Sequence, residues 1–245
     1  MKKQVTIKGI NLSYHEFGKG NPLLFLHGGR LRAQIFIKTL NELSKNYYVI
    51  VPDIPGYGDS STPKEPWSFG DYAEFFITLI EYLKIKEIIV VGYSLGGGIA
   101  YTITSMSKKV KKLILIDSAG IEKISDDELK RDINRLMFYL IHPWYFVTLF
   151  TLIKEWILFN LKHLLRKGDM NNIRINLGNS CQYLINIKVP TTIIWAKDDD
   201  IFPLKIAKKL KQSIKTSTLF IVKGNHDWIL YDQKKFAEYL NKALR

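Results

Sequence analysis

Short runs of apolar, strand-forming residues alternate with segments of helical spacing through most of this 245-residue chain. The apolar runs lie at residues 5–7, 12–17, 23–26, 48–51, 88–91, 113–116, 191–195 and 219–222. Helical spacing is found at residues 34–44, 68–83, 204–214 and 228–244, and after the glycines at 96–98. Such alternation predicts an α/β fold, in which helices cover both faces of a mostly parallel sheet. Right-handed crossovers bring the loops that follow the strands to one edge of the sheet, where ligands bind.

The alternation stops between about residues 120 and 188. We therefore expect a core domain formed by residues 1–119 and 189–245, with a helical insertion at 120–188. One α/β domain with an insertion accounts for the whole length, because single domains of this class often run to roughly 250 residues. The insertion is unusually apolar, and its residues 136–153 contain no formally charged side chain.

The charge of the chain is strongly positive, since 36 Lys and Arg residues stand against 23 Asp and Glu residues, a net +13. The basic residues are scattered, and the sequence has no recognition helix, zinc-ligand spacing or RNA-binding aromatic motif. We therefore expect no nucleic-acid partner. The excess charge is typical of a solvated surface, and it also favours contact with an anionic membrane surface or an anionic substrate.

Cys181 is the single cysteine of the chain, which excludes an internal disulfide and a cysteine-rich metal site. The basic N-terminal residues are not followed by the apolar stretch of a secretory signal. Both features indicate a cytoplasmic protein, with peripheral membrane association left open. The sequence does not indicate the oligomeric state.

The strongest chemical signal is the pattern Gly92-x-Ser94-x-Gly96, which lies directly between a predicted strand and a predicted helix. A serine on such a sharp turn adopts a strained backbone conformation and exposes its hydroxyl above the sheet. Glycine is expected two residues to either side, because side chains there would clash. This context predicts that Ser94 is a nucleophile.

A serine hydroxyl is a weak nucleophile and needs a general base. His226 follows the last predicted strand, so its loop should reach the same sheet edge as Ser94. The base in turn needs a carboxylate to orient it. The run Asp198-Asp199-Asp200 follows the preceding strand, and Asp117 follows the strand before that one, so the residues alone leave four candidates.

Two backbone N–H groups are candidates to stabilise the oxyanion that forms when a serine attacks a carbonyl. The N–H of Leu95 follows the nucleophile and lies at a helix N-terminus, which favours negative charge. The turn His27-Gly28-Gly29 follows another strand and allows close approach, and we choose Gly29 as the second donor.

These motifs resemble those of the α/β-hydrolase superfamily, in its single-domain esterase-like branch. The resemblance rests on His27-Gly28-Gly29, on the stretch from Asp53 to Ser60, on the Ser94 turn, and on the acid and base loops. It implies an α/β-hydrolase fold with a sheet of about eight strands, a triad of Ser94, Asp199 and His226, and an oxyanion hole at Gly29 and Leu95. Asp199 is selected because the acid of related sequences typically lies four residues before a proline, here Pro203. Asp53 and Gly56 are implied to shape a loop beside the site.

Two positions depart from the family pattern: Ala196 stands where glycine often follows the tryptophan of the acid loop, and Asn225 intervenes in the usual Gly-His pair. Asp198 therefore remains the second choice for the triad acid.

The resemblance also implies that the helical insertion is a lid that shapes substrate specificity. We expect a small hydrophobic ester as substrate, and a pocket lined by His27, Tyr93, Phe138, Trp144 and Phe146. A membrane span through the apolar stretch is not expected, because a single crossing would separate Ser94 from His226. The scheme implies no metal and no organic cofactor.

The sequence is therefore interpreted as that of a serine hydrolase, a carboxylesterase, that acts through an acyl-enzyme. The alternatives are a lipid hydrolase of the monoacylglycerol type at a membrane surface, other triad chemistry such as amide or peptide cleavage, C–C bond hydrolysis or acyl transfer, and a small-molecule receptor of the same fold.

Overall fold

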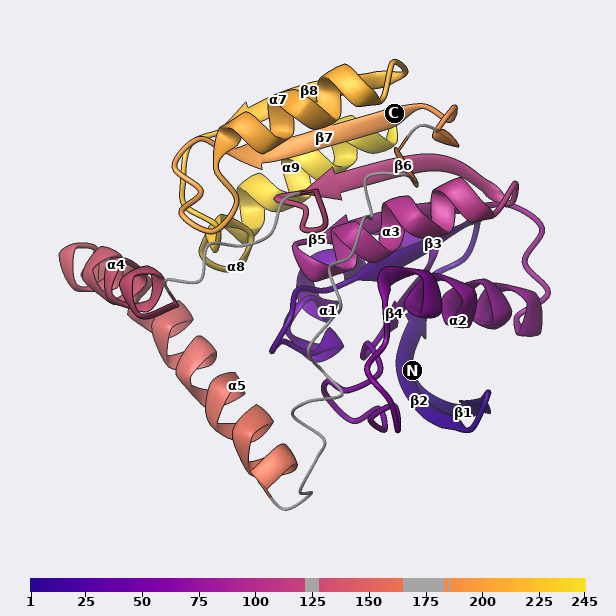
Figure 1. The fold of residues 1–245 in the computed structure, drawn as a ribbon, viewed down its shortest axis with the longest axis horizontal. Coiled ribbons are helices and arrows are strands. Elements are labelled where there is room, and N and C mark those ends of the chain that lie inside the picture. Colours follow the sequence, from indigo (N-terminus) through magenta and orange to yellow (C-terminus); the bar gives the residue numbers. More distant parts are fainter. Residues whose placement is uncertain (122–127, 165–182, 185) are drawn as a thin grey trace.

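The computed structural model of this chain describes residues 1–121, 128–164, 183–184 and 186–245. Its centre is one sheet with the strand order β1-β2-β4-β3-β5-β6-β7-β8 (Figure 1). The strands are β1 Lys2–Ile7, β2 Ile10–Phe17, β3 Asn21–Leu26, β4 Tyr47–Pro52, β5 Ile88–Tyr93, β6 Val110–Ile116, β7 Thr191–Ala196 and β8 Ser217–Val222. Strand β2 pairs antiparallel with β1 and β4, whereas the pairs from β4 to β8 are parallel. The expected mostly parallel eight-stranded sheet is thus confirmed.

Helices cover both faces of this sheet. The helices of the described residues are α1 Ile37–Leu40, α2 Phe69–Tyr82, α3 Leu95–Met106, α4 Glu128–Ile141, α5 Phe146–Leu164, α7 Leu204–Ser213, α8 Trp228–Tyr231 and α9 Gln233–Leu244, of which α4 and α5 do not cover the sheet. Side chains of α2, α3 and α7 pack with Val90 on one face, and side chains of α1, α8 and α9 pack with Val91 on the other. Successive residues of a central strand therefore enter two separate cores, which explains why that strand is apolar throughout.

Two predicted helices differ in detail from the structure. Residues 34–44 form two 3₁₀ turns, Ala33–Ile35 and Asn41–Lys45, on either side of the short helix α1. The segment predicted as one helix at 228–244 is divided at Asp232, whose side chain accepts a hydrogen bond from the N–H of Lys235 and caps α9. Helical periodicity does not reveal such a break, because both pieces bury the same apolar side.

The start of α2 agrees with its sequence signal. Ser68 is the N-cap and accepts a hydrogen bond from the N–H of Asp71, while the Asp71 carboxylate accepts from the N–H of Ser68. This reciprocal capping satisfies two N–H groups that the first turn of a helix leaves unpaired.

Along the chain, helices α4 and α5 follow β6 and precede β7, and the 3₁₀ turn Pro143–Tyr145 joins them. In Figure 1 they lie outside the helices that cover the sheet, with α5 extending along the flank of the core. No single helix among the described residues is both long and apolar enough to cross a bilayer. The pair Arg135–Ile141 and Pro143–Leu164 meets these criteria only when taken together, and it is bent by 113°.

The division into a core domain and an insertion at 120–188 stays a prediction. Cys181, like the rest of residues 165–182, lies outside the described residues.

Candidate active site

The turn between β5 and α3 holds Ser94 in a strained conformation, with φ 52° and ψ −117°. A positive φ is costly for a residue other than glycine, so the surroundings must hold it in place. The N–H of Ser94 donates to the carbonyl of Ile116 at 2.9 Å, which ties the turn to the neighbouring strand. A Cβ at Gly92 would overlap the carbonyl of Gly96, and a Cβ at Gly96 would overlap the carbonyl of Leu26. The backbone itself therefore requires both glycines.

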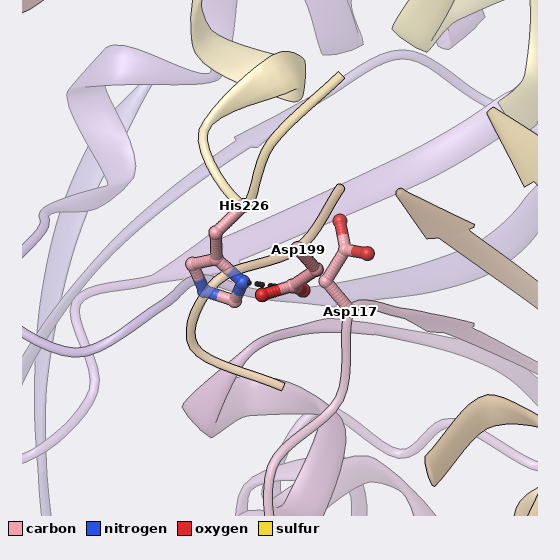
Figure 2. Close-up of side chains that lie close together, drawn as sticks. All are labelled: Asp117, Asp199 and His226. Atoms are coloured by element: carbon pink, nitrogen blue, oxygen red, sulfur yellow. Dashed lines mark hydrogen bonds and ion pairs between the residues drawn. The ribbon is translucent and has the colours of Figure 1, made fainter. Parts of the chain in front are cut away.

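His226 lies beside this serine at the carboxyl ends of the strands. Its Nε2 is 3.0 Å from Ser94 Oγ, and its Nδ1 is 2.8 Å from Oδ2 of Asp199. Figure 2 shows the imidazole directed at the Asp199 carboxylate, with Asp117 behind it. His226 and Asp199 are both buried. Hydroxyl, imidazole and carboxylate thus form one chain of hydrogen bonds, in which Nδ1–H donates to Asp199 and Nε2 accepts from the hydroxyl.

Asp199 is fixed in this orientation by its own loop. Its Oδ1 accepts hydrogen bonds from the N–H groups of Ile201 at 2.8 Å and Phe202 at 2.7 Å, which leaves Oδ2 for the histidine. Asp198 is exposed, and its N–H is bound to the carbonyl of Gly224. The structure therefore brings Asp199, and not Asp198, to His226.

Asp117, the fourth candidate acid, is buried beside Asp199, on the side away from His226 (Figure 2). One of its carboxylate oxygens accepts from the N–H of Ala196 and the other from Nε1–H of Trp228, both at 2.7 Å. Burial, and then the nearby charge of Asp199, raise the pKa of Asp117 well above its usual value. Asp117 therefore links the acid loop to α8 and does not orient the imidazole.

Asp117, Asp199 and His226 also lie close enough together to be tested as a metal site. Their geometry does not fit a cation. The Asp117 oxygens already face two N–H donors. The Nδ1 of His226 points its hydrogen at Asp199, so it has no lone pair to offer.

The electrostatics at His226 favour the imidazolium form. Burial would lower the pKa of its imidazole, but the charge and hydrogen bond of Asp199, with smaller contributions from other nearby carboxyl groups, together outweigh burial, so the pKa rises to about 9. The site therefore stabilises the cation that forms when the imidazole takes a proton from Ser94.

The candidate oxyanion donors lie on either side of the nucleophile turn. A Cβ built on Gly29 would be 3.7 Å from a methyl carbon of Leu95, so the two residues are neighbours. Leu95 is the first residue of α3. In the part of the chain that the structure describes, neither N–H donates a hydrogen bond. Both groups are therefore available to a ligand.

The prediction that His27 contacts substrate is wrong. The ring is completely buried, and its Nε2 accepts a hydrogen bond from the N–H of Ile54 at 3.0 Å. Its Nδ1 lies 2.7 Å from the carbonyl of Gly28, and since Nε2 accepts, Nδ1 must donate. With both nitrogens occupied by backbone groups, His27 joins the glycine turn to the loop after β4.

The prediction that Tyr93 contacts substrate is also wrong. Tyr93 is buried, and its hydroxyl donates to the carbonyl of His226 at 2.9 Å. Its ring stacks on the imidazole with a centroid distance of 5.2 Å. The side chain thus supports the base from within the core.

The three aromatic residues predicted to line the pocket lie elsewhere. Trp144 and Phe146 are 68% and 59% exposed, on the outer surface of the α4–α5 connection. Phe138 stacks on His142 and lies next to Tyr231 of α8. Trp144 and Phe146 therefore face the surroundings, whereas Phe138 packs toward α8.

Asp227 and its two partners on α4 are not predicted by the sequence. The side chain of Asp227 is completely buried and accepts bonds from both Nε and an Nη of Arg135, and from the hydroxyl of Tyr139 at 3.1 Å. These contacts connect α4 to the residue that follows the base. The only sequence signal was an acidic residue next to His226, with no indication of a partner 92 positions away.

The loop from Asp53 to Ser60 is shaped as the resemblance implied. The Asp53 carboxylate accepts from the N–H groups of Ala33 at 2.7 Å and Asp59 at 3.0 Å. Gly56 adopts a φ of 94°, which glycine tolerates and other residues rarely adopt. The loop is thereby held beside the Gly29 turn.

Comparisons with known proteins agree with this geometry. The sequence profile of the alpha/beta hydrolase fold matches residues 21–150. The chain is 28% identical over 250 positions to the AB hydrolase superfamily protein YisY of Bacillus subtilis (strain 168), covering 94% of this chain and 93% of the relative.

Two solved structures share the fold at low sequence identity. The meta-cleavage product hydrolase CumD of Pseudomonas fluorescens IP01 superposes with a TM-score of 0.80 at 22% identity, covering 99% of this chain and 97% of that one. A thermophilic esterase of Thermogutta terrifontis gives a TM-score of 0.77 at 18% identity, covering 100% and 98%. The sheet order, the strained serine between β5 and α3 and the profile match identify this chain as a member of the α/β-hydrolase family.

Proposed function

We propose that this protein is a serine hydrolase that cleaves carboxylic esters with an apolar acyl group. The observation that carries the proposal is the continuous hydrogen-bond chain from Ser94 Oγ through His226 to Asp199. This arrangement is what activates a hydroxyl as a nucleophile.

In the first half of the reaction, Ser94 Oγ attacks the ester carbon while Nε2 of His226 takes the hydroxyl proton. Asp199 holds the tautomer that leaves Nε2 free to accept, and it stabilises the imidazolium. The carbonyl oxygen becomes an oxyanion, which accepts hydrogen bonds from the N–H groups of Gly29 and Leu95. The imidazolium then gives its proton to the leaving alcohol, and the acyl group remains on Ser94.

In the second half, His226 takes a proton from a water molecule, whose oxygen attacks the acyl carbon. Collapse of this second tetrahedral intermediate breaks the bond to Ser94, and the imidazolium returns its proton to the serine oxygen. The products are the carboxylic acid and the regenerated hydroxyl. Only protein groups and water take part in this scheme.

The choice of an apolar acyl group rests on the side chains next to the candidate oxyanion donors. Tyr57 Oη is 3.7 Å from the position that a Cβ on Gly29 would take. The Tyr57 ring stacks on Phe159 of α5 at a centroid distance of 5.6 Å, and Leu95 lies on the same side of Gly29. Burial raises the pKa of Tyr57, so its phenol stays neutral. Leu95 and the stacked rings of Tyr57 and Phe159 therefore offer an apolar wall against which such a group would bury.

Two measurements test the proposal. A fluorophosphonate should label the wild-type protein at Ser94, as located by peptide mass spectrometry, and Ser94→Ala should abolish labelling. Ser94→Ala should also lower kcat by on the order of 10³–10⁶ without changing the melting temperature by more than a few degrees.

A panel of p-nitrophenyl esters with acyl chains of about two to twelve carbons, with matched anilides, tests the substrate class. We expect kcat/KM to rise with chain length and to exceed that of the anilides. Faster cleavage of the anilides would refute the ester assignment, and equal turnover of all chain lengths would refute the apolar wall.

A further inference from the structure

Most large apolar side chains of helix α5 face the surroundings, while its buried side is mainly polar. The side chains of Thr148, Glu155 and His163 are buried together with one apolar residue, Phe159. The apolar side chains on the other side are exposed, with Val147 at 79% and Phe150 at 67%. A usual surface helix turns its apolar stripe toward the core, so this broad exposed stripe is unusual.

Specific contacts fix this orientation. Glu155 Oε2 accepts a hydrogen bond from Nε of Arg32 at 2.7 Å. Lys162 Nζ donates to the carbonyls of Gly58 at 2.9 Å and Ser60 at 2.6 Å. The polar side of α5 is therefore anchored to the loops beside the candidate site, and rotating its apolar side inward would break these bonds.

The exposed apolar surface continues from α5 across the 3₁₀ turn onto α4. We call it the apolar arm, and it consists of Leu136, Met137, Leu140, Ile141, Trp144, Phe146, Val147, Phe150, Ile153, Trp156, Ile157, Leu161 and Leu164. Among residues 136–164, Lys154 is exposed, whereas the other charged residues, Glu155 and Lys162, are buried or half-buried. A surface of this kind is large for a monomeric soluble protein and indicates a contact site.

The net charge of the chain favours an anionic bilayer over a second copy of the chain as the partner of the apolar arm. A second copy would bring another net charge of +13, so that long-range repulsion opposes self-association through the arm. An anionic bilayer attracts the same charge and offers hydrocarbon to the apolar side chains. Trp144 and Trp156 fit this environment, because tryptophan is favoured at the boundary between headgroups and acyl chains.

We propose that the apolar arm docks the protein on the surface of an anionic lipid bilayer. Because the chain bends by 113° between the two helices, they do not form one straight span, and we expect both to lie in the plane of the interface. Docking does not depend on the reaction proposed for Ser94. One consequence of docking does rest on that proposed function: a lipid-soluble ester would reach the site from the membrane.

The experiment is flotation of the full-length protein with two kinds of vesicle, phosphatidylcholine alone and phosphatidylcholine with about 30% phosphatidylglycerol. We expect binding to the anionic vesicles, weaker binding at about 0.5 M NaCl, and little binding to the neutral ones. The double variant Val147→Glu/Phe150→Glu should bind at least about tenfold more weakly, because each new charge must leave water to enter the interface.

The matched control is Tyr82→Glu/Met106→Glu, which places the same two charges on exposed residues of α2 and α3 and should bind like wild type. Ser94→Ala should also bind like wild type, which separates docking from substrate capture at the candidate site. Brominated lipids should quench fluorescence of the unaltered protein, and Trp144→Phe/Trp156→Phe should remove that quenching. Of the other three tryptophans, Trp195 and Trp228 are buried, and Trp67 packs against α2.

Three outcomes would overturn the proposal. The first is equal binding of the double variant and wild type, and the second is the absence of quenching by brominated lipids. The third is a dimer in sedimentation analysis that the double variant converts to a monomer, together with no vesicle binding, since the arm would then be an interface between copies of this chain. A docking failure with intact fluorophosphonate labelling would leave the proposed chemistry standing.

Discussion

Individual residues of the candidate site are held by their neighbours more than by their own preferences. Ser94 keeps a positive φ because the backbones of Gly92, Gly96 and Leu26 pack against its turn. Asp199 faces the imidazole because two N–H groups hold its other oxygen. The strain and the preorganised dipoles are thus built into the fold before a substrate arrives.

Replacing Asp199 tests the assignment of the acid. Asp199→Asn should lower kcat by on the order of 10³-fold or more, because the imidazole loses both its tautomer and the charge that stabilises its cation. The carboxylate opposes burial and raises the His226 pKa to about 9, so its removal lowers that pKa. The acidic limb of the residual pH–rate profile should therefore move to lower pH, which stopped-flow or steady-state assays across pH would reveal.

Asp198→Asn is the control for this experiment, because Asp198 is exposed and should change neither kcat nor the position of the limb. Loss of activity in Asp198→Asn combined with an active Asp199→Asn would show that the acid is misassigned.

Gly96→Ala tests the steric requirement at the nucleophile turn. The new methyl group would overlap the carbonyl of Leu26, which is backbone and part of β3. We expect a loss of about 3 kcal/mol in the free energy of unfolding, measured by denaturant titration. Gly29→Ala is the matched comparison, because its nearest neighbours are at 3.7 Å and its backbone N–H is retained, so stability should change little.

At the scale of elements, α4 is attached to the base loop by an ion pair whose carboxylate is buried. Arg135 and Tyr139 of α4 both contact Asp227, which follows His226 directly in the chain. The Asp227 side chain is 1% exposed, and burial of this kind is tolerated because the guanidinium binds it through two nitrogens. The helix is thereby coupled to the position of the imidazole.

Arg135→Gln should destabilise the fold by about 3 kcal/mol, since it leaves the Asp227 carboxylate buried without its cation. If α4 helps to position the base, kcat for a soluble ester should fall as well, with a smaller change in KM. Arg135→Lys keeps the charge and should restore part of both quantities. An unchanged kcat in a destabilised Arg135→Gln protein would limit the pair to a structural role.

At the scale of the whole molecule, two features separate the part that carries the candidate chemistry from the part that meets the surroundings. The sheet and its covering helices bury two apolar cores and bring Ser94, Asp199 and His226 to one edge. The apolar arm stays outside these cores, joined to them by Arg32–Glu155 and Arg135–Asp227. The contacts that position the site and those proposed to bind lipid therefore lie on opposite sides of the same helices.

The sequence by itself determined the alternation of strands and helices, and with it the edge of the sheet where the serine and histidine meet. These are local properties, since apolar periodicity and glycines beside a sharp turn are dictated by neighbours in the chain. Only the tertiary structure decided that His27 and Tyr93 support the backbone, that Asp227 is paired with a helix far away in sequence, and that the aromatic side chains at 144 and 146 face outward. Each of these features depends on which residue, far away in the sequence, pairs with a buried polar atom or covers an apolar side chain. The spacing of residues along the chain does not indicate such contacts.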